Sequence, residues 1–189
     1  MYIGLTGPIA SGKGVAAEYF KSRGFHYISL SKILREIAKQ NGIPEERKAL
    51  QDLGNAMREK HGVGFLASEA CKKIRAGNTE NCVIDGIRNP GEVDELRKNL
   101  KGFVLISIDA DFDKRFEWAF KRNKDSDPKT KSGFMSANSR DLGEGEKNTG
   151  QAVANCMKIA NHIVLNDGTE RELTLKIDKL YRAIKSHGD

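Results

Sequence analysis

A glycine-rich turn at residues 7–14, reading Gly-Pro-Ile-Ala-Ser-Gly-Lys-Gly, constrains the fold of this chain more than any other stretch. It follows the apolar run Tyr2 to Leu5 and precedes apolar residues at helical spacing, which is the order of strand, turn and helix that a phosphate-binding loop requires. Gly7 and Gly12 permit backbone angles that let successive N–H groups point at phosphate oxygens, and the next helix presents its positive end to the same anion. The sequence therefore predicts a nucleotide site in which Lys13 supplies the cation that follows the transferred phosphoryl group.

The predicted nucleotide-binding residues are the loop and the start of the helix after it: Gly7, Ala10, Ser11, Gly12, Lys13, Gly14 and Val15. The usual pattern has a serine or threonine directly after the lysine, and its hydroxyl binds magnesium. Gly14 and Val15 offer no such oxygen. A magnesium ion would therefore be held through water, by phosphate, or by a carboxylate elsewhere in the chain.

Composition and length bound the possible functions. The 189 residues suffice for one domain with a sizeable core, so we expect a single domain over residues 1–189. With no long apolar run and no signal-like amino terminus, the chain is expected to be cytoplasmic and without a membrane partner. The net charge of +6 would suit a nucleic acid, but the lysines and arginines are scattered rather than striped and small anionic metabolites explain them equally well, so a nucleic acid partner is not expected. The sequence leaves monomer and homodimer open.

Apolar runs alternate with helical patterns along the chain. Strands are predicted at Tyr2 to Leu5, Phe25 to Ile28, Asn81 to Ile84, Phe103 to Ile108 and His162 to Leu165, and helices at 14–21, 32–40, 45–60, 65–74, 111–122, 151–160, 169–184 and from Asn89 onward. This alternation predicts an α/β fold, with a parallel sheet between two helical layers. The helices within residues 31–75 would form an insert between strands two and three. The polar stretch 123–133 reads as a mobile loop.

Three charged residues would meet at one edge of the predicted sheet. Asp85 follows a buried strand, and ligands of parallel sheets bind at the carboxyl ends of the strands. An acid beside a phosphate-binding loop can bind magnesium or its waters. Arg35 and Arg88 would emerge at the same edge, and the guanidinium fork binds two phosphate oxygens at once.

Two segments resemble the nucleoside monophosphate kinases. Residues 28–35, Ile-Ser-Leu-Ser-Lys-Ile-Leu-Arg, are similar to the acceptor segment of that family, and residues 85–88, Asp-Gly-Ile-Arg, resemble its Asp-Gly-Phe-Pro-Arg signature with one residue fewer. The resemblance implies an enzyme that moves a phosphoryl group from ATP, with magnesium, to a small phosphorylated acceptor. It implies acceptor-binding roles for Ser31, Arg35, Arg88 and Glu92, a metal role for Asp85, and a lid at 123–133. It also implies that Arg115, Arg122 and Arg140 are cations for the transition state, beside Lys13 and Arg88.

A second family competes with the first. Residues 3–13 resemble the opening of dephospho-coenzyme A kinases more closely, and residues 160–166 are similar to the last strand of those enzymes. They phosphorylate a sugar hydroxyl, which needs a carboxylate to accept its proton, and they carry that acid just after strand two. Residues 29–32, Ser-Leu-Ser-Lys, supply none. The sequence therefore favours a monophosphate acceptor, while a nucleotide-binding regulatory module without turnover stays open.

Overall fold

The computed structural model describes residues 1–123 and 128–186 and contains, within them, a five-stranded sheet in which all four strand pairings are parallel. The strands are β1 (Tyr2–Thr6), β2 (His26–Ser29), β3 (Cys82–Asp85), β4 (Phe103–Asp109) and β5 (His162–Leu165). They lie in the order β2-β3-β1-β4-β5. The predicted α/β class and the parallel sheet are confirmed. The chain forms β2 and β3 on one side of β1 and then crosses to form β4 and β5 on the other, so the strand order reverses beside β1, where open parallel sheets bind ligands.

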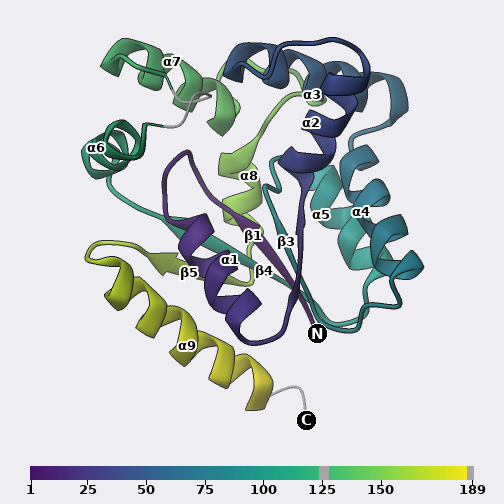
Figure 1. Cartoon of the computed structure of the whole chain (residues 1–189), viewed down its shortest axis with the longest axis vertical. Coiled ribbons are helices and arrows are strands. Elements are labelled where there is room, and N and C mark those ends of the chain that lie inside the picture. Colours follow the sequence, from purple (N-terminus) through teal and green to yellow (C-terminus); the bar gives the residue numbers. More distant parts are fainter. Residues whose placement is uncertain (124–127, 187–189) are drawn as a thin grey trace.

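Helices cover both faces of the sheet (Figure 1). They are α1 (Lys13–Ser22), α2 (Leu30–Gln40), α3 (Arg47–His61), α4 (Phe65–Ala76), α5 (Pro90–Asn99), α6 (Phe112–Arg122), α7 (Lys131–Leu142), α8 (Val153–Lys158) and α9 (Glu170–Ser186). On one face α1 and α9 pack side by side over Ile3 and Leu5. On the other face α2, α4 and α5 pack over Ile84 and Leu105. Alternate strand residues point to opposite faces, so each buried strand serves both layers.

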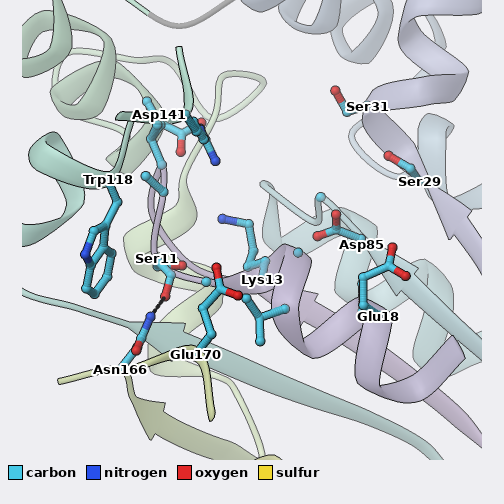
Figure 2. Close-up of a pocket in the computed structure, with 18 of the residues that line it drawn as sticks. Ser11, Lys13, Glu18, Ser29, Ser31, Asp85, Trp118, Asp141, Asn166 and Glu170 are labelled. Carbon is cyan, nitrogen blue, oxygen red and sulfur yellow. Dashed lines mark hydrogen bonds between the residues drawn. The ribbon is translucent and has the colours of Figure 1, made fainter. Parts of the chain in front are cut away.

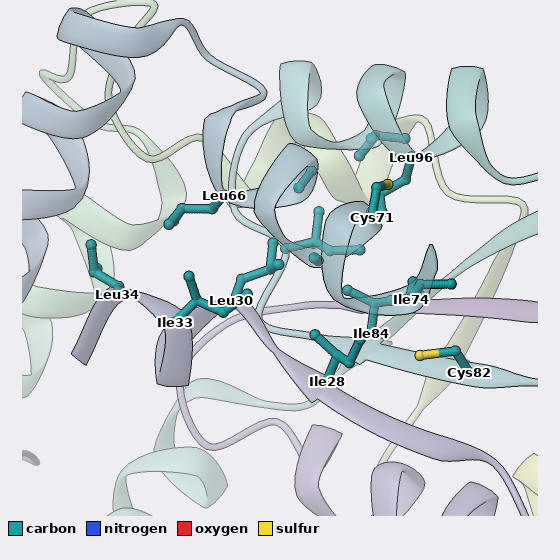
Figure 3. Packing of buried hydrophobic residues seen from close by; sticks show 14 of the residues in the cluster. Ile28, Leu30, Ile33, Leu34, Leu66, Cys71, Ile74, Cys82, Ile84 and Leu96 are labelled. Carbon is teal, nitrogen blue, oxygen red and sulfur yellow. The ribbon is translucent and has the colours of Figure 1, made fainter. Parts of the chain in front are cut away.

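The helical segment between β2 and β3 is anchored to the sheet by an apolar stripe. Leu30, Ile33 and Leu34 recur at helical spacing on α2 and are buried against α4 and strands β2 and β3, as Figure 3 shows. Burial of a leucine or isoleucine side chain contributes roughly 1.5–3 kcal/mol each. The same helix carries Arg35 one position beyond the stripe, so this packing fixes where that guanidinium can reach.

Helix α7 was not predicted from the sequence. Its residues, Lys-Ser-Gly-Phe-Met-Ser-Ala-Asn-Ser-Arg-Asp-Leu, are mostly polar, and Gly133 has low helix propensity. The helix forms because the Thr130 side chain caps it by accepting a hydrogen bond from the Gly133 N–H, and because Phe134 is fully buried. The predicted loop over 123–133 is therefore wrong at residues 131–133, which begin this helix, and residues 124–127 lie outside the described part.

Two further observations concern the cysteines and the membrane. Cys71, Cys82 and Cys156 are buried and free. Of the helices within residues 1–123 and 128–186, none combines the length and the apolar character that crossing a bilayer would need.

Candidate active site

The glycine-rich loop leaves the end of β1 and turns tightly before α1. Its backbone has positive φ at Gly7 (135°), Ala10 (62°) and Gly12 (107°). A Cβ atom at Gly7 would collide with the carbonyl oxygen of Ile108, and one at Gly12 would lie 2.7 Å from the Asn166 side chain. Glycine is therefore required at both positions, because φ is positive and because there is no room for a Cβ atom. A phosphate-binding loop is expected to need this backbone freedom.

Lys13 folds back over this loop. Its Nζ donates hydrogen bonds to the carbonyl oxygens of Gly7 (2.6 Å) and Pro8 (2.8 Å). Burial lowers the pKa of Lys13 to about 8, although Asp85 and Asp141 oppose the shift. Both of these bonds go to backbone carbonyl oxygens and neither goes to a carboxylate, so an incoming polyanion would be a strong partner for the ammonium group.

Side chains from distant segments hold the loop in place. Asn166 donates from Nδ2 to the carbonyl of Ser11 (3.0 Å), and Arg115 donates from Nη1 to the carbonyl of Ile9 (3.1 Å). The other bonds of Arg115 go to the Ala110 carbonyl and the Asn138 side chain, and the residue is buried. Arg115 therefore serves to fix the loop, and the structure does not support its predicted role as a transition-state cation.

A cavity of about 880 Å³ opens at the carboxyl edge of the sheet. Eleven of the predicted site residues line it: Ala10, Ser11, Gly12, Lys13, Gly14, Val15, Ser31, Arg35, Asp85, Arg88 and Arg122. Figure 2 shows Lys13 between Asp85 and Asp141, and Asn166 beside Ser11, to which it donates a hydrogen bond; Trp118 and Glu170 line the same cavity. The topology thus gathers segments that are distant in sequence into one polar cleft.

Asp85 has one oxygen available for a ligand. Its Oδ2 accepts a hydrogen bond from the Tyr27 hydroxyl (3.2 Å), while its buried Oδ1 has no hydrogen-bond partner among the described residues. Burial, together with Asp85, raises the pKa of Tyr27 to about 12, so this hydroxyl stays a donor. No group of three or more acidic, histidine or cysteine side chains that could hold a metal occurs in the described part. Magnesium usually keeps several of its waters and is bound through one or two carboxylates together with phosphate oxygens, so the single carboxylate of Asp85 suits this ion.

Arg88 lies opposite a carboxylate that sequence reasoning missed. Its Nε is 3.2 Å from Oδ1 of Asp141, an ion pair without hydrogen-bond geometry, and Asp141 is only 1% exposed. Asp141 belongs to α7. The signal was present in the sequence, because Phe134, Ala137, Asn138 and Asp141 recur at helical spacing and all four are buried. That spacing would have placed Asp141 on the inner face of the helix.

Arg140 and Gly7 do not line the cavity. Arg140 precedes Asp141 on α7 but forms ion pairs away from the cavity. Its Nη2 lies 2.7 Å from Oδ1 of Asp52 on α3, and its Nε lies 2.6 Å from Oε1 of Glu146. In this conformation the Arg140 guanidinium is neutralised by these two carboxylates, and the structure does not bring it to the cavity that Lys13 lines. Gly7 is the first residue of the loop and shapes it through its positive φ.

Glu92 is likewise absent from the cavity lining. Its Oε2 accepts from the N–H groups of Arg88 (2.7 Å) and Asn89 (3.1 Å), and its Oε1 pairs with Arg58 (3.3 Å). The helix start predicted at residues 89–92 is confirmed as a capping box. Because the carboxylate is 1% exposed, the predicted contact with an acceptor base has no support. Burial raises the pKa of Glu92, and the charge of Arg58 opposes that shift.

The comparisons with known proteins agree with this geometry. A family model described as AAA domain matches residues 3–141. The UPF0200 protein PH1008 of Pyrococcus horikoshii is 32% identical over 99% of both chains. The fold is similar to shikimate kinase from Aquifex aeolicus (TM-score 0.55, 16% identity, covering 100% of this chain and 98% of that one). It is also similar to dephospho-CoA kinase from Campylobacter jejuni (TM-score 0.52, 15% identity, 97% and 96%).

Proposed function

Because the chain belongs to the AAA domain and UPF0200 families and has the fold of a phosphate-loop kinase, we propose that it transfers the terminal phosphoryl group of ATP to a small phosphorylated acceptor. The most suitable acceptor is a nucleoside or deoxynucleoside monophosphate. One observation carries the proposal: a single cavity is lined by the loop with Lys13 and by Arg35 and Arg88. A donor site and an anion site therefore share one space.

The residues divide the work between donor and acceptor. The loop N–H groups and Lys13 would hold the donor phosphates, and Arg122, which also lines the cavity, would add positive charge. Magnesium, when bound, would neutralise charge on the donor's phosphate oxygens, and Asp85 is the residue that would hold its waters. Arg35 and Arg88 would bind the acceptor's phosphate.

The transfer itself needs no general base. A monophosphate is already an anion at neutral pH. One of its oxygens attacks the terminal phosphorus of ATP, the bond from that phosphorus to the bridging oxygen breaks, and ADP leaves with the electron pair on the bridging oxygen. The arginines hold the nucleophile in line and balance its charge.

Transfer to a hydroxyl is the second candidate. The buried, unpartnered Oδ1 of Asp85 favours it, because such an oxygen could accept the proton of a sugar hydroxyl. This reading gives Asp85 the role of base and leaves the arginines to hold a phosphate elsewhere on the acceptor, as in a coenzyme A precursor.

A coupled assay for ADP production separates these possibilities. The purified chain is supplied with ATP, magnesium and, one at a time, nucleoside monophosphates, deoxynucleoside monophosphates and dephospho-coenzyme A. We expect turnover that depends on a monophosphate and is lost in Lys13→Ala, with circular dichroism confirming that the variant is folded. Phosphorylation of dephospho-coenzyme A alone would favour the hydroxyl mechanism. ATP binding without ADP production in the presence of any of these acceptors would leave only the regulatory module, which does not turn over.

A further inference from the structure

Arg47 reaches the active-site cavity from the helical insert. It is the first residue of α3, and nothing in its local sequence marks it as a phosphate ligand. The fold nevertheless places it on the cavity wall together with Arg35 of α2 and Arg88 of the turn after β3. Three guanidinium groups from three separate segments thus face one space.

The same three arginines also line a small side cavity of about 40 Å³. Its other described lining residues are Ser31, Leu34, Leu50, Gln51 and Gln151, and no acidic side chain is among them. A volume of this size holds about three water molecules, which is comparable with a phosphate or carboxylate group and far too small for a nucleobase. The side cavity is small and is lined by positive guanidinium groups, a hydroxyl group and amide groups. These are the properties of a site for an oxyanion.

Arg35 and Arg88 already bind carboxylate oxygens of the chain itself. Arg35 is paired with Glu45 at 2.7 Å, and Arg88 lies 3.2 Å from Asp141. The charges of both Arg88 and Arg47 lower the pKa of Lys13, so the Arg47 guanidinium acts on the phosphate-binding loop as well as on its own helix. The first turn of α3 contains no acidic residue, and Glu46, which precedes Arg47 as the N-cap residue, makes no side-chain capping hydrogen bond.

We propose that Arg47 completes a three-arginine subsite, with Arg35 and Arg88, that binds the phosphate of the acceptor where the two cavities meet. The acceptor role rests on the proposed function, whereas binding of the anion does not. An anion held between Arg47 on the insert and Arg88 in the turn after β3 would also link α3 to the cavity edge of the sheet, with each guanidinium donating to a different oxygen.

Inorganic phosphate is the probe that tests this subsite. Isothermal titration is carried out at low salt, with a non-hydrolysable ATP analogue and magnesium present to fill the donor half. Lys48→Ala is the matched control for Arg47→Ala, since Lys48 is the next residue in the same turn, is exposed and lies outside both described cavity linings. Both variants remove one positive charge from the same helix end.

We expect Arg47→Ala to weaken phosphate binding by at least about tenfold, as for a lost charge-assisted hydrogen bond, and Lys48→Ala by less than about twofold. Arg47→Lys should recover part of the affinity, and thermal unfolding should show that every variant is folded. Equal losses in the Arg47 and Lys48 variants, or no phosphate binding by the unaltered chain, would overturn the subsite. A chain that binds phosphate in this pattern but phosphorylates no monophosphate would keep the subsite and refute the kinase proposal.

Discussion

The lowered pKa of Lys13 predicts that donor binding takes up protons. The ordinary lysine value is 10.5 and the folded value is about 8. The difference of about 2.5 pH units corresponds to about 3 kcal/mol, which is the cost of keeping this ammonium charged inside the loop. Between pH 8 and 10.5 the unfolded chain binds more protons at Lys13 than the folded protein does. The cost is therefore absent above pH 10.5, where the side chain is neutral in both states. It grows as the pH falls below 10.5 and is complete once the pH has fallen through 8.

A bound polyphosphate reverses this penalty, because the negative charge stabilises the ammonium form. At pH 8 about half of the Lys13 side chains are neutral in the free protein. Binding of ATP with magnesium should therefore take up close to half a proton per site at pH 8 and almost none at pH 6.5 from this group. Titration calorimetry in two buffers of different ionisation enthalpy measures the number directly.

Lys13→Met should abolish the uptake, whereas Lys101→Met should leave it unchanged. Lys101 is exposed in the turn before β4, at the opposite end of the strands from the cavity. If the Lys13 variant took up as many protons as the unaltered chain, the proton would belong to another group and the assignment of Lys13 to the donor phosphates would be wrong.

Three further predictions test the surroundings of the site. Glu92→Gln should lower the free energy of unfolding by about 3–5 kcal/mol, because it removes the buried carboxylate that is paired with the buried Arg58 guanidinium; a loss below about 1 kcal/mol in denaturant titration would contradict this. Arg88→Ala should reduce kcat/KM for the acceptor by about 2–4 kcal/mol in transition-state terms while ATP affinity stays nearly constant, and a matching loss of ATP affinity would count against an acceptor role. Gly7→Ala should destabilise the fold by at least about 2 kcal/mol, since alanine is strained at φ 135° and its Cβ meets the Ile108 carbonyl; unchanged stability in thermal unfolding would show that the loop can relax.

The sequence by itself determined the features that depend on short stretches of chain. The apolar run before residue 7 and the glycines at 7 and 12 predict a strand and a loop from sterics alone, and both are present. The cap at Asn89, the alternation of strands with helices and the parallel sheet also follow from local patterns. Arg35 and Arg88 could be placed at the cavity because each follows a predicted strand, and parallel strands end at one edge.

Only the tertiary structure decided which charges face the cavity. Asp141 and Arg140 are neighbours on α7, yet one lies buried beside Arg88 and the other pairs with α3, because a helix turns successive residues by about 100°. Glu92 has the spacing of an acceptor contact, but the capping geometry and Arg58 occupy both of its oxygens. Arg47 carries no local signal at all. Its position depends on how α3 packs against α2 and α4 and on side-chain bonds from α3 to Thr149 and Gln151, far along the chain, which no local pattern encodes.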